Sequence, residues 1–348
     1  MFKFNSLIIA LFICSSIISF EIQAQNPLES ALDYTIFTLN DATLDNNECE
    51  GAVAIGGNLI LDGAYTLGNN SAGSFYDDTD AFASSLVVGG RIIYNGGNGV
   101  NVTNGYVKIC DTTDSYIYSD GIQPTRITPN LFDSTPRITI SQSQTEESII
   151  SCPIDFQTAF DNLQAQTLSL AACESNIELQ PIDPNNPNNE TNKKRIILPN
   201  ETNILNLTWA ELNSISELGF TNQPSASATL IINIDASAEN GDLTWNLPNF
   251  PGVSDSHGAY IIWNFYNTTS LIMVNTGTIY GTILAPFADV VDSNNGNING
   301  QVAALSFVHN GGEMHHHPFE GNAIGCNTVS EPTSCPTYCI SISITKNL

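Results

Sequence analysis

The stretch GTIYGTILA at residues 277–285 is matched in pattern by GNINGQVAA at residues 296–304. Both segments have glycine at the first and fifth positions, isoleucine at the third, an apolar residue at the seventh and alanine at the ninth. The second segment begins 19 residues after the first. Alternate side chains of a strand share one face, so Ile279, Gly281 and Ile283 are expected to point the same way. A repeat of about 20 residues suits one coil of a stacked β-solenoid.

A second pair of matching segments lies nearer the N-terminus. Residues 53–61 (VAIGGNLIL) and 86–94 (LVVGGRIIY) each contain an apolar triplet, Gly-Gly, one polar residue and another apolar triplet. Other short apolar runs, at residues 230–234, 260–263 and 271–274, are separated by Asn, Gly and Asp turns. We therefore predict a mainly β fold, a right-handed parallel β-helix-like solenoid. A β-sandwich is the alternative, because it shares short strands and similar turns.

One segment has helical rather than strand periodicity. Residues 156–170 contain Phe156, Phe160, Leu163 and Leu168 at near-helical spacing and no Gly or Pro, and Asp155 is placed to cap the N-terminus. We predict one accessory amphipathic helix that lies along the β body. A second helix is predicted at residues 209–218, with Thr208 as its cap.

The charge balance excludes several classes of partner. The chain has 9 Lys+Arg and 35 Asp+Glu, a formal net charge of −26. Such a chain cannot gather enough cations on one face to neutralise a run of phosphates, so nucleic acid is excluded as a partner. An anionic membrane surface is disfavoured for the same reason. The basic cluster at residues 193–195 (KKR) is predicted to be the solvated end of a loop.

The first residues have the pattern of a targeting segment. Lys3 precedes an apolar run at residues 7–20, and residues 23–25 (QAQ) offer a small residue for cleavage. This is typical of a secretory signal peptide at residues 1–24, and no later stretch is long and apolar enough to span a membrane. We therefore divide the chain into the signal peptide, a β domain at residues 25–321 and a cysteine-containing tail at residues 322–348. The predicted location is secreted and extracellular.

Seven cysteines would remain after the signal peptide is removed. In an oxidising compartment, disulfides are the expected state, and the odd number leaves one thiol buried or paired with another chain. Cys152 and Cys173 bracket one segment, and three cysteines crowd the tail, so local bridges are expected in both places. The seven residues are Cys49, Cys110, Cys152, Cys173, Cys326, Cys335 and Cys339. Six N-x-S/T sites would carry glycans if the source is a eukaryote, and would mean little in a bacterium; they begin at Asn69, Asn101, Asn189, Asn200, Asn206 and Asn267.

Several of these segments together resemble the bacterial choice-of-anchor A domain, an adhesive domain of exported proteins. The resemblance covers roughly residues 33–321. Its most specific part is GTILAP at residues 281–286, followed by GEMH at residues 312–315 and PFEG at residues 318–321. The other matching segments are residues 34–40 (YTIFTLN), 50–58 (EGAVAIGGN), 86–90 (LVVGG), 262–265 (IWNF) and 300–304 (GQVAA).

The resemblance implies an extracellular, β-rich protein with an adhesive or surface-layer role. It carries no agreed catalytic residues, so none are assigned here. The family is named for its varied C-terminal anchors, whereas residues 322–348 contain no sorting motif or membrane span. This departure favours a released protein, or one tethered through a disulfide.

The histidine run at residues 315–317 is the most conspicuous candidate metal site. On a strand, His315 and His317 would face one side, where Glu313 could join them to hold zinc or copper. The alternative is a hydrogen bond between Glu313 and His315 that closes a turn. Calcium is the other candidate ion, on the carboxylates of residues 77–80 (DDTD) or 289–296 (DVVDSNNG), although neither follows the EF-hand pattern. No cofactor is assigned firmly.

Catalysis is the rival hypothesis, because β-helices often carry glycan-cleaving sites and carboxylates are plentiful. No G-x-S-x-G, H-E-x-x-H or phosphate-binding loop is present, however. Ice binding is a third hypothesis, but the regular T-x-T ladder it calls for is missing. The aromatic residues Trp245, Trp263, Phe265 and Tyr266 are contact candidates, with burial favoured for Trp263.

We therefore expect a non-catalytic, adhesive or structural protein. Its predicted partner is an extracellular protein or glycan surface, contacted over an extended face. A further partner is predicted through a disulfide from an odd cysteine, and the chain is not membrane-embedded. The alternative function is an extracellular glycan-acting hydrolase.

Overall fold

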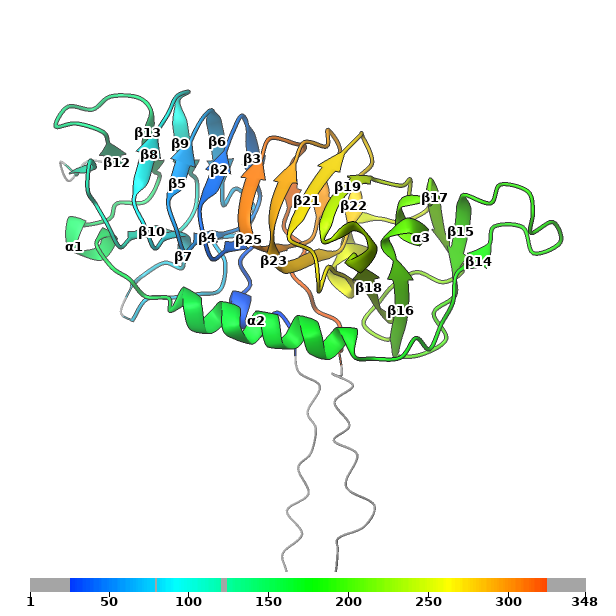
Figure 1. Ribbon diagram of the computed structural model, residues 1–348. Coiled ribbons are helices and arrows are strands. Elements are labelled where there is room, and N and C mark those ends of the chain that lie inside the picture. The colour runs from blue at the N-terminus through cyan, green and yellow to red at the C-terminus, as the bar shows by residue number, and fades with distance from the viewer. Residues whose placement is uncertain (1–25, 79, 120–123, 324–348) are drawn as a thin grey trace, which may run out of the picture.

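The computed structural model describes residues 26–78, 80–119 and 124–323, and they form a parallel β-solenoid with three faces (Figure 1). The predicted signal peptide and residues 324–348 of the predicted tail lie outside the described residues. No helix in the described ranges is long and apolar enough to cross a bilayer.

The strands stack in three lengthwise rows, which we call faces a, b and c. Face a contains, in spatial order, β10 (Tyr106–Ile109), β7 (Ser84–Val88), β4 (Val53–Ile55), β1 (Ile36–Thr38), β25 (Val302–His309), β23 (Thr282–Asp292), β20 (Ile261–Asn264), β18 (Thr229–Asp235) and β16 (Thr202–Thr208). Face b contains β8 (Ile92–Tyr94), β5 (Leu59–Leu61), β2 (Ala42–Leu44), the second halves of β25 and β23, β21 (Ser270–Val274) and β19 (Asp242–Asn246).

Face c is a separate sheet. It contains β11 (Tyr116–Tyr118), β12 (Thr125–Thr128), β13 (Arg137–Ile140), β9 (Gly99–Val102), β6 (Ala64–Leu67), β3 (Asn47–Cys49), β26 (Met314–His315), β24 (Ile298–Asn299) and β22 (Ile279–Tyr280). A small sheet of β14 (Gln180–Pro181), β15 (Lys193–Ile196) and β17 (Glu217–Phe220) lies at one end. The helices are η1 (Glu29–Ala31), α1 (Glu146–Ile149), α2 (Phe156–Ala171), α3 (Trp209–Asn213), η2 (Ser237–Glu239) and η3 (Asp255–Tyr260).

The repeated segments lie on top of one another, as predicted. Ile279 of β22 pairs in parallel with Ile298 of β24, and Val53 of β4 pairs in parallel with Leu86 of β7. Parallel pairing through the body of the solenoid, with antiparallel pairs confined to β11–β12–β13 and β14–β15, confirms the solenoid and excludes the β-sandwich. The branched and aromatic side chains at equivalent positions fill the interior, where Trp245, Trp263 and Phe265 are all fully buried.

One detail of the repeat prediction is wrong. Residues 277–285 do not form a single strand, because the chain turns from face c to face a at Gly281, whose φ is +120°. A Cβ at this position would lie 2.8 Å from the backbone oxygen of Ile261 in the neighbouring coil. The glycine of the motif therefore marks a corner that a residue with a side chain could not occupy without strain.

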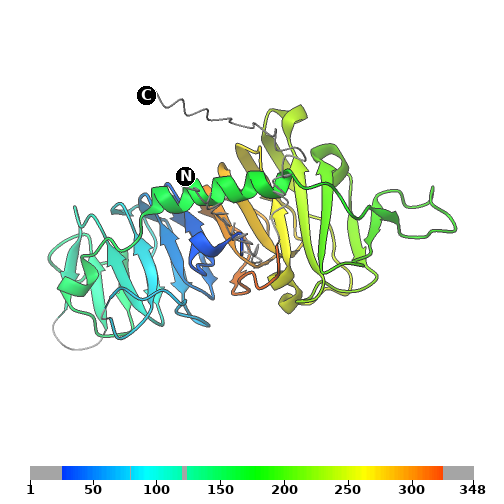
Figure 2. The ribbon, with the colours of Figure 1, turned by 90° about the horizontal axis from the view of Figure 1, so that it is seen from below.

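The chain path is not a simple spiral. It enters in the middle of the solenoid at β1, winds to one end through β13, and returns along the outside as α2 to the other end (Figures 1 and 2). From β16 it winds back until β25 pairs with both β1 and β2. The first and last coils thus meet at a seam, and α2 joins the two half-solenoids.

Helix α2 covers face a, as the amphipathic pattern predicted. Asp155 caps it by accepting a hydrogen bond from the backbone of Thr158 at 3.0 Å. Phe156 and Phe160 stack on Phe37 of β1, with ring centroids 5.5 and 5.4 Å away.

The C-terminal half of α2 is held by an asparagine ladder. Asn206, Asn233 and Asn264 occupy equivalent positions of β16, β18 and β20. Their side-chain amides donate to the carbonyl oxygens of Cys173, Leu170 and Thr167, at 2.8, 2.9 and 2.9 Å. Asn233 also donates to Asn206, and Asn264 to Asn233, at 2.8 Å each. The ladder thus adds side-chain hydrogen bonds to carbonyl groups in and just after the last turns of α2.

Two local predictions need correction. The predicted second helix stops at Asn213, and residues from Glu217 form strand β17, although Thr208 does cap the helix through a capping box. The basic cluster Lys193–Arg195 is not a loop end but part of strand β15, which pairs in parallel with β17.

The cysteine prediction is also partly wrong. Cys152 pairs with Cys110, 42 residues earlier, and not with Cys173, which is itself disulfide-bonded. Among the described residues Cys49 is the free cysteine, and it is buried in the core. Its burial raises the pKa of the thiol to about 12, so Cys49 offers no reactive thiol to another chain. Cys326, Cys335 and Cys339 lie outside the described residues.

Candidate functional site

The outer row of face b forms a continuous ladder of β-branched side chains. In each three-residue strand the two flanking side chains point into the core, as Leu59 and Leu61 do, and the middle side chain points outward. The strand register brings these outward residues side by side. In spatial order they are Ile93, Ile60, Thr43, Val308, Val291, Ile272 and Thr244. We call this row the β-branched stripe.

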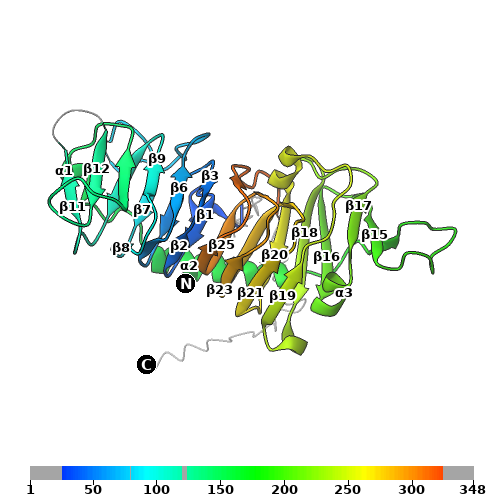
Figure 3. The same cartoon turned by 90° about the horizontal axis from the view of Figure 1, so that it is seen from above.

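The stripe is long and partly exposed. Six of its side chains are half-buried by their neighbours and Thr244 is exposed. Seven strands with a separation of about 4.8 Å give the row a length of about 29 Å. Figure 3 shows the strands of this face side by side, one after another along the length of the molecule. Branching at Cβ leaves each side chain little rotamer freedom, so the row can contact a surface with a small loss of entropy.

Polar rows flank the stripe on both sides. One row contains Ser306, Asp289, Ser270 and Asp242, which pair in register across four strands. The other contains Asp62, Asp45, Asn310 and Ser293, each directly following a strand of face b. An apolar centre with a polar rim is the usual composition of a binding surface.

Face c carries a different, polar row. Its outward residues Thr139, Asn101, Thr66 and Glu48 lie in register on β13, β9, β6 and β3. Face a is covered by α2. Face b is therefore the face that combines exposure with an apolar centre.

The predicted metal-site residues only partly come together. His315 Nε2 lies 3.2 Å from Glu313 Oε2 and 3.3 Å from the side-chain amide nitrogen of Asn297. His316 has other partners. Its Nδ1 contacts Thr35 Oγ1 at 2.8 Å, and its backbone nitrogen donates to Glu50. Across residues 26–78, 80–119 and 124–323, no three His, Cys, Asp or Glu side chains cluster as metal ligands. The site at Glu313, His315 and His317 stays a prediction.

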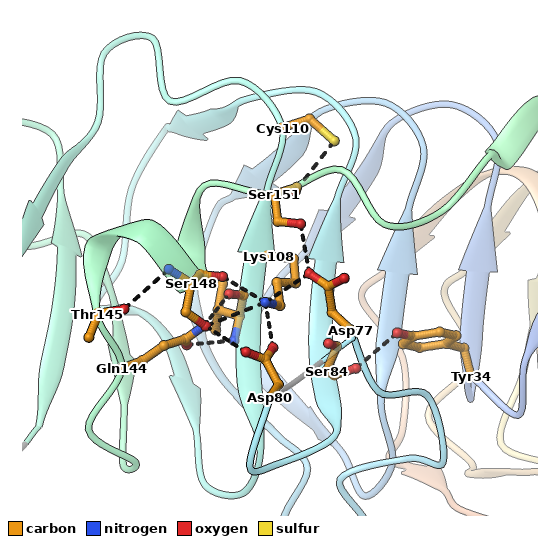
Figure 4. A network of polar contacts seen from close by, with 11 residues as sticks. Tyr34, Asp77, Asp80, Ser84, Lys108, Cys110, Gln144, Thr145, Ser148 and Ser151 are labelled. Atoms are coloured by element: carbon orange, nitrogen blue, oxygen red, sulfur yellow. Dashed lines mark hydrogen bonds and ion pairs between the residues drawn. The ribbon is translucent and has the colours of Figure 1, made fainter.

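The first calcium candidate is engaged by a cation of the protein itself. Lys108, which is buried on β10, lies 3.0 Å from Asp77 Oδ2 and 2.5 Å from Asp80 Oδ2, and donates to the backbone oxygen of Ser148 (Figure 4). Burial opposes ionisation of Asp77, but hydrogen bonds from Ser151 and Lys108 outweigh it and lower the pKa. The Lys108 ammonium group thus joins the loop before β7 to α1, and two of the carboxylates already have a positive partner.

The second calcium candidate does not gather its carboxylates, because Asp289 is exposed and hydrogen-bonded to Ser306, whereas Asp292 points into the core. Asp292 is fully buried beside His309. Its burial raises the pKa to about 7. A carboxyl group that resists ionisation is a poor calcium ligand.

A pocket with two carboxylates tests the hydrolase hypothesis. Glu211 and Asp235 line a cavity of about 210 Å³ together with Tyr266. Hydrogen bonds from Thr208 lower the pKa of Glu211, and those from Asn267 and Ser237 lower that of Asp235. A glycosidase needs one carboxyl group of raised pKa as its general acid. Neither residue fits this role.

The stripe was not predicted as a site, although its signal was present. Residues 59–61 (LIL) and 92–94 (IIY) were interpreted as apolar triplets for the core. In a strand of three residues the middle side chain must point away from the two others. Two apolar triplets at equivalent positions of adjacent coils therefore imply an apolar outer row as well as a core row.

The family comparison places the chain in a surface-binding domain family. Residues 27–316 match the profile of the family described as "Putative Ice-binding-like adhesive domain". This match supports the surface-binding character implied by the sequence resemblance, although the matching family is not specifically the choice-of-anchor A domain. No curated protein sequence matches the chain.

The similar solved structures are distant in sequence. An ice-binding protein from the Antarctic ascomycete Antarctomyces psychrotrophicus has 9% identity and a TM-score of 0.34, covering 83% of this chain and 97% of its own. A glycosylated ice-binding protein from an Arctic yeast has 10% identity and a TM-score of 0.30, covering 85% and 93%. An ice-binding protein from an Antarctic Flavobacteriaceae bacterium has 12% identity and a TM-score of 0.26, covering 87% and 100%.

Proposed function

The chain belongs to the ice-binding-like adhesive domain family, and from this premise we propose that it is a secreted, non-catalytic protein that adheres to an external surface through face b. The β-branched stripe carries the proposal. It is a partly exposed apolar row on a face that α2 leaves open, and a contiguous apolar patch at the surface marks a contact site in a soluble protein.

Three classes of surface fit a long row of this kind. An extracellular protein or glycan surface follows from the sequence resemblance, and ice follows from the name of the matching family. The stripe has threonine at two of its seven positions, Thr43 and Thr244, and isoleucine or valine at the others. This composition favours contact that excludes water over contact through hydroxyl groups. We therefore place protein and glycan surfaces before ice.

The finer assignments belong to the same proposal. They are membership of the choice-of-anchor A group, a signal peptide at residues 1–24, a β domain at residues 25–321 and a tail at residues 322–348. A glycan-acting hydrolase is the alternative. It would show itself as the release of soluble sugars, whereas adhesion leaves the polymer intact.

We expect the double substitution Ile60→Asp and Val291→Asp to weaken surface binding by at least about 100-fold. Burying one such side chain in a contact contributes about 1.5–3 kcal/mol, so removing two of them and adding two charges should cost more than about 3 kcal/mol. Both side chains point outward, so the thermal unfolding midpoint should change little. The measurement is adsorption of residues 25–348 to ice, insoluble polysaccharides and immobilised matrix proteins, with and without calcium.

The matched control adds the same two charges to face c. Thr66→Asp and Asn101→Asp lie in adjacent strands of that face, in the same register. Binding should survive in this variant. Binding that face c substitutions abolish and face b substitutions spare would contradict the proposal, and so would no adsorption to any surface of the panel.

Zinc binding at Glu313, His315 and His317 is a separate prediction. We expect calorimetric titration of the protein with zinc to give a micromolar dissociation constant, and we expect His315→Ala to abolish the heat of binding. His257→Ala is the control, because His257 lies in η3 and contacts Ser254. If the wild-type protein gives no heat with micromolar zinc, the prediction is wrong.

A further inference from the structure

The end of the solenoid that carries β11, β12 and β13 presents apolar side chains to solvent. Leu131 and Phe132 are 70% and 80% exposed, more than any other large hydrophobic residue among the described residues. Tyr116 and Tyr118 of the adjacent strand β11 are 44% and 38% exposed. A solenoid needs a polar cap at its ends to remain soluble on its own, whereas the described residues at this end include these four exposed apolar or aromatic side chains.

The loop that carries Leu131 and Phe132 is held in place by polar contacts. Asn130 accepts a hydrogen bond from the backbone of Phe132 at 3.0 Å and donates to Ser134 at 3.0 Å. Thr128 donates to the backbone oxygen of Asn130 at 2.6 Å. The loop therefore does not expose its apolar tip through lack of structure.

Two arginines fix the same loop from the other side. The Asp133 carboxylate lies 3.1 Å from Arg126 Nε and 2.6 Å from Arg137 Nη1. Arg126 also lies over the ring of Tyr118, with its guanidinium carbon 4.6 Å from the ring centroid. The charged side chains thus orient both the loop and Tyr118, and the apolar groups are presented in a preorganised arrangement.

Strand β11 is the terminal strand of face c. It pairs with β12 on one side, and no described residue pairs with its other edge. Such an edge offers backbone N–H and C=O groups to another strand, and soluble proteins usually protect it with charge, proline or a covering segment. Here the edge strand itself carries Tyr116 and Tyr118, and the apolar loop follows β12, the strand that pairs with it.

We propose that this end is a self-association surface, on which a second copy of the chain pairs its own β11 antiparallel to the first. The arrangement is a two-fold dimer in which face c continues from one copy into the other. The Tyr116–Tyr118 segment is self-complementary in this arrangement. With Ile117 at the centre, Tyr116 of one copy lies opposite Tyr118 of the other, and cross-strand aromatic pairs are stabilising.

The available area predicts a weak dimer. Leu131, Phe132, Tyr116 and Tyr118 expose roughly 400 Å² per copy, taking about 150–250 Å² as the full surface of a large side chain. About 800 Å² for both copies is below the range of stable interfaces. The two copies also repel each other, because each carries a formal net charge of −26. Added salt screens this repulsion, so we expect salt to strengthen the dimer, whereas it would weaken one held by ion pairs.

The dimer has one consequence that rests on the proposed function. A two-fold axis perpendicular to face c exchanges the sides on which faces a and b lie. Face b of the second copy therefore lies on the side where the first copy has face a. The two β-branched stripes would then point to different sides, and the dimer could join two surfaces. Self-association itself does not depend on any surface ligand, so it is tested without one.

Sedimentation velocity of the protein over a range from low to high micromolar concentration tests the proposal. We expect the sedimentation coefficient to rise with concentration, and to rise further in higher salt. The double substitution Leu131→Asp and Phe132→Asp should leave only monomer. Leu168→Asp is the control, because Leu168 is a 51% exposed apolar residue on α2, away from this end. A wild-type protein that stays monomeric, or a Leu131→Asp/Phe132→Asp variant that still associates, would overturn the proposal.

Disulfide trapping tests the strand pairing separately. A mixture of Tyr116→Cys and Tyr118→Cys proteins should form a covalent dimer faster than either protein alone, because the antiparallel register places residue 116 opposite residue 118. Equal trapping in all three samples would reject this register. Dimerisation without preferential trapping of the mixture would show that the copies meet in another way.

Discussion

Asn264→Ala should lower the free energy of unfolding by about 2–4 kcal/mol, a large effect for one polar side chain. Its amide donates to Thr167 O and to Asn233 Oδ1 at 2.9 and 2.8 Å, and its oxygen accepts from Thr167 Oγ1. The substitution leaves buried polar groups of α2 and β18 without these partners, and each such group costs about 1–3 kcal/mol. Urea unfolding followed by circular dichroism measures the change.

The control for this substitution is Asn246→Ala. Asn246 is exposed on β19 of face b, so the same truncation should change the free energy of unfolding by less than about 0.5 kcal/mol. Equal effects of the two substitutions would show that the ladder does not hold α2. If the ladder does hold it, Asn264→Ala should also speed amide hydrogen exchange in the C-terminal turns of α2, relative to the N-terminal turns beside Phe37.

The parts of this fold that could be predicted are those coded locally. The glycine-flanked repeats predict the stacking of β22 on β24, because equivalent residues must lie above one another in a solenoid. The spacing of Phe156, Phe160 and Leu163 predicts α2, and Asp155 predicts its start. Each of these inferences needs only neighbours within about one coil of the chain.

The parts that could not be predicted depend on contacts between distant segments. The seam pairs Thr43 with Val308, and nothing local to either residue indicates the other. The disulfide joins Cys110 to Cys152, although Cys152 and Cys173 are closer in sequence. The β-branched stripe falls between these cases, since each outward residue is visible in its own triplet but the continuous row depends on the seam.

The seam encloses a buried cluster of titratable side chains. His309 Nδ1 lies 2.6 Å from Tyr65 Oη, and His309 Nε2 lies 2.6 Å from the backbone oxygen of Gly312. Because a carbonyl oxygen only accepts, Nε2 carries the proton and Nδ1 accepts from the tyrosine. Asp292 Oδ2 lies 3.7 Å from His309 Nε2, and its Oδ1 accepts from the backbone of Asn294. Both the imidazole and the carboxyl group are fully buried.

Burial shifts the two groups in opposite directions. It raises the pKa of Asp292 to about 7 and lowers the pKa of His309 to about 4. The folded state therefore binds more protons at Asp292 than the unfolded state does, so this group's contribution to stability falls as the pH rises from about 4 to about 7. The folded state binds fewer protons at His309 than the unfolded state does, so the contribution of His309 to stability is lost as the pH falls from about 6.5 to about 4. In the wild-type protein the two contributions largely cancel between about pH 4 and 6.5.

Asp292→Asn should remove the pH-dependent contribution of Asp292 to stability, so that the contribution of His309 is no longer cancelled. We expect the variant to exceed the wild-type protein in free energy of unfolding by up to about 4 kcal/mol at pH 8, because it no longer buries a carboxylate that must ionise there. Near pH 4 the difference should almost vanish, because the wild-type carboxyl group is then neutral in the folded state. Urea unfolding of both proteins at intervals from pH 4 to pH 8 measures the difference.

The shape of the difference curve identifies its cause. The difference in free energy of unfolding between Asp292→Asn and the wild-type protein grows with pH only if the pKa of Asp292 is raised in the folded state. This difference should stop growing near pH 7. Asp242→Asn, which removes a carboxylate from exposed β19, should follow the wild-type curve within about 0.5 kcal/mol. Parallel curves for Asp292→Asn and the wild-type protein would mean that Asp292 ionises as readily in the folded protein as in water. The seam would then hold a charged carboxylate, and His309 would be expected to remain protonated beside it at neutral pH.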